Sequence, residues 1–207
     1  MPNGTGRWFY VALPAVFASL ATAKAGGQDN KQDGFSDIYQ SGKYELTLSS
    51  GALFSPIGAD HDRPTLNYTL STLQFGWMFT DVRGSGWLRG NWETTGEIMG
   101  GTVFAGRGNY MAGATGWLKY NFVQPDWRVA PYLGAGVGAE ATDFDPSLIG
   151  ETFNFNLNIA AGMKCFITSR WALDLQCRYQ HISNAKISNR DIGINAVGPI
   201  VGLSYLF

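Results

Sequence analysis

Residues 151–167 read ETFNFNLNIAAGMKCFI, and this stretch decides the fold. Apolar side chains take one set of alternate positions, and polar side chains take most of the other set. The apolar set is Phe153, Phe155, Leu157, Ile159, Ala161, Met163 and Ile167, and the polar set is Asn154, Asn156, Asn158 and Lys164. Because successive side chains of a β-strand point to opposite faces, the stretch predicts a strand with one apolar and one polar face. Transmembrane β-barrels have this pattern, with the apolar face toward lipid and the polar face toward the lumen.

The same alternation recurs from residue 43 to the end of the chain. It predicts strands at 43–54, 65–80, 87–103, 109–122, 128–142, 151–167, 171–184 and 195–207. Short connections at 81–86, 123–127 and 168–170 contrast with mostly longer ones at 55–64, 143–150 and 185–194, as periplasmic turns contrast with external loops. We therefore predict an all-β fold, an eight-stranded antiparallel up-and-down transmembrane β-barrel of the outer-membrane type, over residues 43–207.

Both ends of the chain agree with export to a bacterial outer membrane. An apolar stretch from Trp8 to Leu20 is followed by small residues with Ala-x-Ala spacing, which predicts a cleaved signal peptide over residues 1–25. The alternative, a membrane anchor, is disfavoured because the stretch is short for a spanning helix and contains Pro14. Residues 26–42 are polar and unpatterned, and we expect a periplasmic lead-in segment. The last residues, PIVGLSYLF ending in Phe207, resemble the C-terminal assembly signal of outer-membrane barrels.

The low content of charged residues argues against one class of partner. The formal net charge is −1 with 15% charged residues, so nucleic acid is not an expected partner. Arg89, Glu93, Glu97 and Glu140 are candidates for a catalytic carboxylate group, but charges in a narrow barrel usually fill it by pairing, and we favour that interpretation.

The two cysteines are predicted to be free and lipid-facing. A hairpin turn at 168–170 places Cys165 opposite Leu173 and Cys177 opposite Ala161, which separates the two sulfurs along the strands.

A candidate site lies at the end of strand 171–184, WALDLQCRYQHISN. Strand parity places His181 and Ser183 on the apolar face with Trp171, and ten residues of tilted strand raise His181 by roughly 25 Å, the height of the apolar band. A hairpin centred on residue 188 pairs 181 with 195 and 183 with 193, so Asn195 joins the same exterior patch. With Asn184 adjoining, the patch has a nucleophile, a base, an orienting group and an oxyanion donor, the parts of an acyl hydrolase. The alternative is an ordinary belt of interfacial residues.

HISNA at 181–185, GIN at 193–195 and the terminal Phe207 together resemble the lipid A 3-O-deacylase (PagL) family, with specific likeness only in the C-terminal part of the chain. The resemblance implies Ser183 as nucleophile, His181 as its base and Asn184 at the oxyanion site. The best-understood form of the family has Glu where this chain has Asn195, and a neutral side chain orients the histidine without offsetting the positive charge it gains. Asp191 is the alternative third residue, and Lys186 stands where glycine is usual.

The sequence thus predicts an outer-membrane lipid A deacylase that uses His181, Ser183 and Asn195, with Asn184 supporting the oxyanion. Lipid A of lipopolysaccharide is the expected substrate, reached by lateral diffusion among the outer-membrane lipids, and no metal or cofactor is implied. The rival hypothesis is a small non-catalytic barrel with a structural role or loops that contact partners. The oligomeric state stays open.

Overall fold

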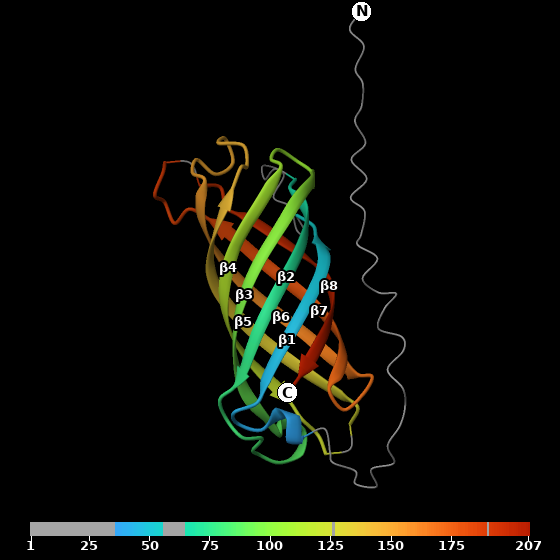
Figure 1. Cartoon of the computed structure of the whole chain (residues 1–207). Helices are drawn as coiled ribbons and strands as arrows, with labels where there is room; N and C mark the ends of the chain where they lie inside the picture. The colour runs from blue at the N-terminus through green and yellow to red at the C-terminus, as the bar shows by residue number, and fades with distance from the viewer. Residues whose placement is uncertain (1–35, 56–64, 126, 190) are drawn as a thin grey trace, which may run out of the picture. The chain divides into compact units, whose positions relative to one another are not determined.

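A computed structural model describes residues 36–55, 65–125, 127–189 and 191–207. The signal peptide predicted at 1–25, and most of the lead-in segment predicted at 26–42, lie outside these residues. The described residues form eight strands and two short 3-10 helices, one before the first strand and one between the second and third strands (Figure 1). The strands are β1 (Tyr44–Leu53), β2 (Asn67–Met78), β3 (Gly90–Ala105), β4 (Tyr110–Phe122), β5 (Val129–Thr142), β6 (Phe153–Phe166), β7 (Trp171–Ser183) and β8 (Ile194–Leu206), and the helices are η2 (Asp37–Tyr39) and η3 (Gly86–Leu88).

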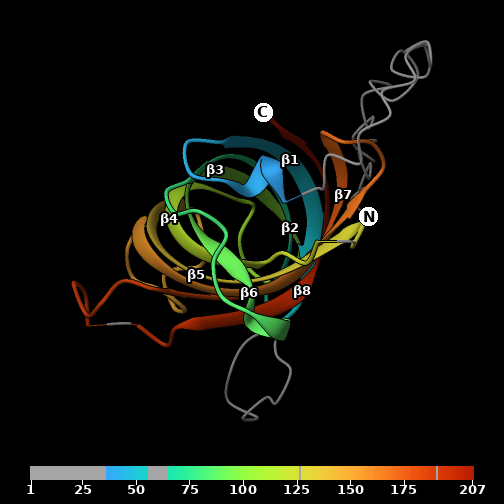
Figure 2. The ribbon, with the colours of Figure 1, turned by 90° about the horizontal axis from the view of Figure 1, so that it is seen from below.

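The strands form one closed antiparallel barrel in sequence order, and β1 pairs with β8 to close it. Figure 2 shows the closed ring along the barrel axis. We call the end with connections 79–89, 123–128 and 167–170 the turn end, and the opposite end the loop end. The predicted fold class is confirmed. The lengths of the connections alternate less regularly than predicted. The turn-end connection 79–89 is long and contains η3, whereas the loop-end connection 106–109 is short.

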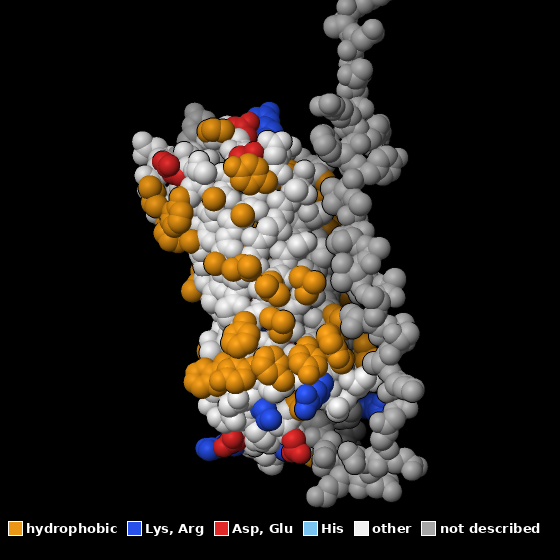
Figure 3. Space-filling view, viewed as in Figure 1, with side chains coloured by type: hydrophobic (Ala, Val, Ile, Leu, Met, Phe, Trp, Pro, Cys, Tyr) orange, Lys and Arg blue, Asp and Glu red, His pale blue; other side chains and the backbone are white. Residues whose placement is uncertain are grey.

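Alternation positions the side chains as the sequence predicts. Along β6, Phe153, Phe155 and Leu157 are exposed on the outer face, whereas Asn154 and Asn156 are fully buried inside. Exposed aromatic side chains gather on the outer face near each end. Near the turn end, Figure 3 shows an apolar row on the face that carries β1 to β4, where exposed aromatic residues include Tyr44, Phe75, Trp77, Trp92 and Tyr120. Such belts mark the interfaces of a membrane.

The lumen is filled, with apolar clusters at both ends and charged pairs between them. The guanidinium of Arg178 forms two hydrogen bonds with Glu97, of 2.9 and 2.6 Å, and Lys119 Nζ lies 3.6 Å from Glu93 Oε1. Lys164 lies between Glu45, at 2.7 Å, and Asp174, at 3.6 Å. Pairing of Glu93 and Glu97 inside the barrel is therefore confirmed.

The predicted charge pairing inside the barrel was wrong for Arg89 and incomplete for Glu140. Arg89 precedes β3 at the turn end, where Nη1 donates to the carbonyl oxygen of Val123 at 2.6 Å, because the strand begins at Gly90 and not at residue 87. Glu140 is buried, but its Oε2 accepts from the amides of Asn156 and Gln180 and no cation lies within ion-pair distance among the described residues.

The end of the lead-in segment has structure that its composition did not indicate. Helix η2 inserts Tyr39, fully buried, into the apolar cluster of the turn end, and the Tyr39 carbonyl oxygen accepts a hydrogen bond from Asn91 at 2.5 Å. Figure 2 shows this helix, in blue, at the turn-end opening of the barrel. Two aromatic residues in a polar stretch, Phe35 and Tyr39, are a weak sequence signal, and only the tertiary contact of Tyr39 explains its role.

Both cysteines are free, as predicted, and the β6–β7 register pairs Cys165 with Leu173 and Cys177 with Ala161.

Candidate active site

The site is built at the loop end of β7, where an inward isoleucine separates two outward polar residues. Ile182 is fully buried in the apolar cluster of the loop end, which also contains Ile194 of β8. Because neighbours in a strand point to opposite faces, the burial of Ile182 directs His181 and Ser183 to the outer surface. Both side chains are partly exposed there. The predicted outward placement of His181 and Ser183 agrees with their positions in β7.

His181 and Asn195 face each other across the β7–β8 ladder. The two residues are register partners, and His181 Nδ1 lies 2.6 Å from Asn195 Oδ1. An amide oxygen only accepts, so the ring nitrogen in this contact carries the proton and donates it. Nε2 of the neutral ring is then left as the acceptor, the form that a general base needs.

Ser183 ends β7, two residues beyond His181 on the same face. Its register partner across the β6–β7 ladder is Phe155, which contacts Phe153 edge to face in the aromatic belt near the loop end. Within the described residues, the structure gives no hydrogen bond between Ser183 and His181. Hydrogen bonds between a nucleophile and its base are often long without substrate and shorten when the substrate binds. The serine therefore lies on the same face as the base, across the ladder from the aromatic pair of Phe153 and Phe155.

Asn184 does not share the outer face in this structure. Its side chain is fully buried, and Nδ2 donates to Ser188 Oγ at 2.8 Å. The Ile187 N–H donates to the Asn184 carbonyl oxygen, and the intervening Ala185 and Lys186 have φ values of 52° and 64°. Positive φ at both central positions is typical of a type I′ turn, which strongly favours glycine. Lys186 thus stands where a glycine would fit without strain.

Asp191, the alternative third residue, lies in the loop and is engaged elsewhere. Its Oδ2 accepts the Lys186 N–H at 3.2 Å, and its backbone forms an isolated bridge with Ile149. The structure therefore brings Asn195, and not Asp191, to His181.

Sequence reasoning missed two neighbours of the histidine, Gly193 and Tyr179. Gly193 has φ +67° and is therefore not in the extended conformation of a strand. The β7–β8 pairing accordingly ends at Ile182 and Ile194, one position short of the predicted pairing of 183 with 193. A Cβ on Gly193 would lie 3.0 Å from His181 Cε1 and 3.8 Å from Nε2. Glycine therefore keeps the Nε2 edge of the ring accessible. The predicted register already placed this glycine opposite Ser183.

The second neighbour, Tyr179, donates its hydroxyl to Asn195 Oδ1 at 2.8 Å. It precedes His181 by two residues on the same face and lies diagonally opposite Asn195, a signal that strand parity contained.

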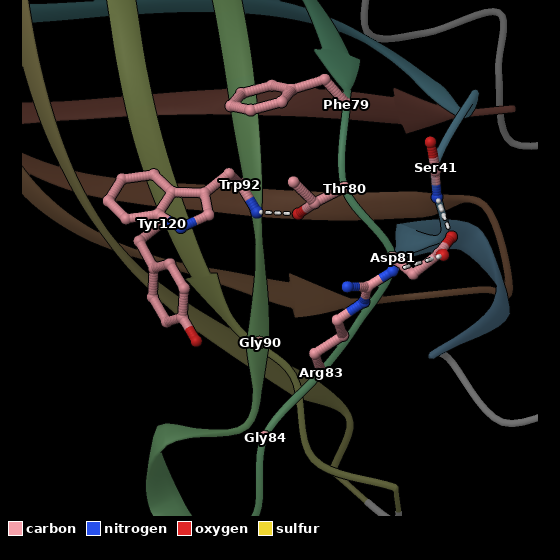
Figure 4. A pocket seen from close by; sticks show the side chains of 9 residues that line it. All are labelled: Ser41, Phe79, Thr80, Asp81, Arg83, Gly84, Gly90, Trp92 and Tyr120. Atoms are coloured by element: carbon pink, nitrogen blue, oxygen red, sulfur yellow. Dashed lines mark hydrogen bonds and ion pairs between the residues drawn. The ribbon is translucent and has the colours of Figure 1, made fainter.

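A pocket of about 480 Å³ lies at the turn end, remote from His181 (Figure 4). Several polar groups of the pocket are bonded to each other. Thr80 Oγ1 accepts the Trp92 N–H at 2.8 Å. Asp81 accepts the Ser41 N–H and lies 3.7 Å from Arg83. Figure 4 shows Ser41, Asp81 and Arg83 on one side, the rings of Trp92 and Tyr120 on the other, and the Thr80–Trp92 hydrogen bond between them. Without a paired nucleophile and base, this pocket is not a candidate hydrolase site.

Two further findings concern the described residues alone. None of their helices has the length and apolarity needed to span a membrane. No three of their His, Cys, Asp and Glu side chains gather in a group that could hold a metal ion.

Fold and site together define an eight-stranded barrel of the outer-membrane type with a histidine, a serine and an asparagine on its outer face. Comparison with known proteins names the family. The sequence profile of the lipid A 3-O-deacylase (PagL) family matches residues 67–204, and the chain belongs to this family, whose activity is lipid A deacylation. No curated protein sequence matches the chain.

Solved structures agree in fold. The crystal structure of the outer membrane enzyme PagL is similar over 76% of this chain and 97% of its own, at 17% identity and a TM-score of 0.54. Neisserial surface protein A (NspA) is similar over 81% of this chain and 98% of its own, also at 17% identity, with a TM-score of 0.58. These two barrels have different names and are similar to this chain at the same sequence identity, so the structural likeness shows the fold alone.

Proposed function

We propose that this protein resides in a bacterial outer membrane, with its loop end outward, and hydrolyses the ester-linked 3-hydroxyacyl chain of lipid A. The contact between His181 Nδ1 and Asn195 Oδ1 carries the proposal, because it selects the basic form of an outward-facing histidine beside Ser183. Family membership supports lipid A as the substrate class. The export signal at residues 1–25 and the periplasmic lead-in at 26–42 are part of the same proposal.

The position of the site fits a substrate that already lies in the membrane. Ser183 and Phe155 lie in the aromatic belt near the loop end, at the height where the acyl ester bonds of an outer-leaflet lipid meet the headgroups. The lumen is filled by charged pairs and apolar clusters, so the substrate reaches Ser183 from the side, by lateral diffusion.

In the proposed reaction, Ser183 Oγ attacks the ester carbonyl carbon while His181 Nε2 accepts the hydroxyl proton. The carbonyl oxygen gains the negative charge. When the ester C–O bond breaks, His181 returns the proton to the departing sugar oxygen, and the acyl group stays on Ser183. Water then releases the fatty acid by the same proton transfers.

The asparagines have different tasks. Asn195 orients His181 through its amide oxygen, but it offers no charge to the imidazolium that forms. We assign the oxyanion to Asn184, and this role requires its buried side chain to leave Ser188 Oγ and turn to the outer face when the substrate binds.

The test is expression of wild type, Ser183→Ala and Ser50→Ala in a Gram-negative host, followed by mass spectrometry of extracted lipid A. Ser50 is the matched control, because it is also an exposed serine of the outer face but lies on β1, bonded to Ser71. We expect wild type and Ser50→Ala to remove one 3-hydroxyacyl group and Ser183→Ala to remove none, with fragment spectra locating the loss. Unchanged lipid A with all three folded proteins would refute the proposal and favour a non-catalytic barrel.

A further inference from the structure

The amide oxygen of Asn195 accepts two hydrogen bonds, one from each end of a short stretch of β7. The Tyr179 hydroxyl donates at 2.8 Å and the His181 ring at 2.6 Å. Tyr179 is 40% exposed on the outer face, between its apolar register partners Ile159 of β6 and Val197 of β8. A phenol usually finds a hydrogen-bond partner in such surroundings, and here the partner is the group that orients the histidine.

We propose that Tyr179 is a positioning residue that holds the Asn195 amide with its oxygen toward His181 and thereby selects the tautomer of the ring. The catalytic consequence rests on the function proposed above, whereas the tautomer itself does not. Tyr179 acts through Asn195 and touches neither the ring nor the substrate in this arrangement.

The need for such a residue follows from the chemistry of an amide. A carboxylate offers oxygen on both sides, but asparagine offers oxygen on one side and NH2 on the other. If the Asn195 amide reversed, Nδ2 would face His181 Nδ1, which would then have to accept. The ring proton would move to Nε2, and His181 could no longer take the proton of Ser183.

Tyr179 disfavours the reversed amide because its own hydrogen needs an acceptor. With the oxygen in place, the phenolic O–H donates to Oδ1. With the amide reversed, the phenol would accept from Nδ2 and its hydrogen would lose this acceptor at the edge of the apolar band, which is costly. The tyrosine thus fixes the orientation that the asymmetric amide of Asn195 leaves open.

The direct test reads the tautomer by ¹⁵N NMR of histidine-labelled protein in detergent micelles. His61 is the only other histidine, so His61→Gln leaves His181 as the only labelled signal. The spectra are recorded at an alkaline pH of about 8.5, because the two nitrogens of a neutral ring report its tautomer. We expect the Nδ1–H form to dominate and Tyr179→Phe to raise the Nε2–H form to a comparable population. Tyr110→Phe, at another exposed outer-face tyrosine, is the control and should change nothing. An unchanged tautomer in Tyr179→Phe would overturn the proposal.

The second test uses the asymmetry of the amide. In the Asn195→Asp background the two carboxylate oxygens are equivalent, so Tyr179→Phe should leave the Nδ1–H form dominant. For deacylation, we expect Tyr179→Phe to lower kcat about tenfold in the wild-type background and at most about twofold in the Asn195→Asp background, at an unchanged KM. An equal loss in both backgrounds would overturn the proposal. If wild type has no deacylase activity, the proposed function fails while the NMR experiment still decides the role of Tyr179.

Discussion

Asn195→Asp is predicted to accelerate deacylation. Aspartate has the shape of asparagine, so it preserves the 2.6 Å contact with His181 Nδ1 and the hydrogen bond from Tyr179. It adds a negative charge beside the imidazolium that forms when Ser183 loses its proton. Because this charge interaction is stronger in the transition state than in the ground state, it should raise kcat and not merely tighten binding.

The magnitude follows from the contact distance. Two unit charges with about 4 Å between their centres attract by about 4 kcal/mol at an effective dielectric constant of 20. His181 and Asn195 are both partly exposed, so solvent screening reduces this value, and about 1.4 to 2.7 kcal/mol is expected to remain. Each 1.36 kcal/mol is about tenfold in rate, so kcat should rise by about ten- to a hundredfold. Asn195→Glu should also raise kcat, and Asn195→Ala should lower it, because alanine leaves the ring without its acceptor.

The assay is a time course of lipid A deacylation in mixed micelles, with products quantified by mass spectrometry and Ser183→Ala as the blank. The gain in Asn195→Asp should disappear when Ser183→Ala is added to it. A kcat no higher than wild type in correctly folded Asn195→Asp, or full activity in Asn195→Ala, would refute the assignment of Asn195 as the orienting residue. A loss confined to Asp191→Ala would transfer that role to the loop.

Three further predictions concern the backbone and the lumen. Gly193→Ala should lower kcat at least tenfold, because its Cβ would press on the histidine ring, whereas Gly42→Ala, also at positive φ but with nothing within 4 Å, should leave the rate unchanged. Lys186→Gly should stabilise the barrel by about 1 kcal/mol in urea titrations by relieving a left-handed φ of 64°, and a lower midpoint would contradict the strain argument. Glu97→Gln should lower the free energy of unfolding of the barrel by about 3 kcal/mol, because it breaks a buried ion pair with Arg178. Glu140→Gln should leave that free energy unchanged or raise it, and equal losses in the two variants would show that Glu140 is also paired.

Strand parity alone determined much of this protein. In a strand the side-chain period is two, so the sequence predicted which residues face outward and which fill the lumen, and the eight strands agree with the structure to within about three residues. Hairpin register is local, and it predicted the pairing of residue 181 with 195 and the separation of Cys165 from Cys177.

Only the tertiary structure decided which polar atoms meet at the site. The amide of Asn184 turns to Ser188, and Asp191 accepts the Lys186 N–H, because these contacts depend on the loop that follows β7. Register brings Tyr179 and His181 near Asn195, but only the folded side chains show that both donate to the same oxygen. The loop contains positive φ angles at two non-glycine residues, Ala185 and Lys186, which composition does not predict. Contacts between residues far apart in sequence, such as Tyr39 in the turn-end cluster, likewise arise only when the barrel closes. A period-two pattern specifies a face, whereas hydrogen-bond partners require distances, and distances exist only in the folded chain.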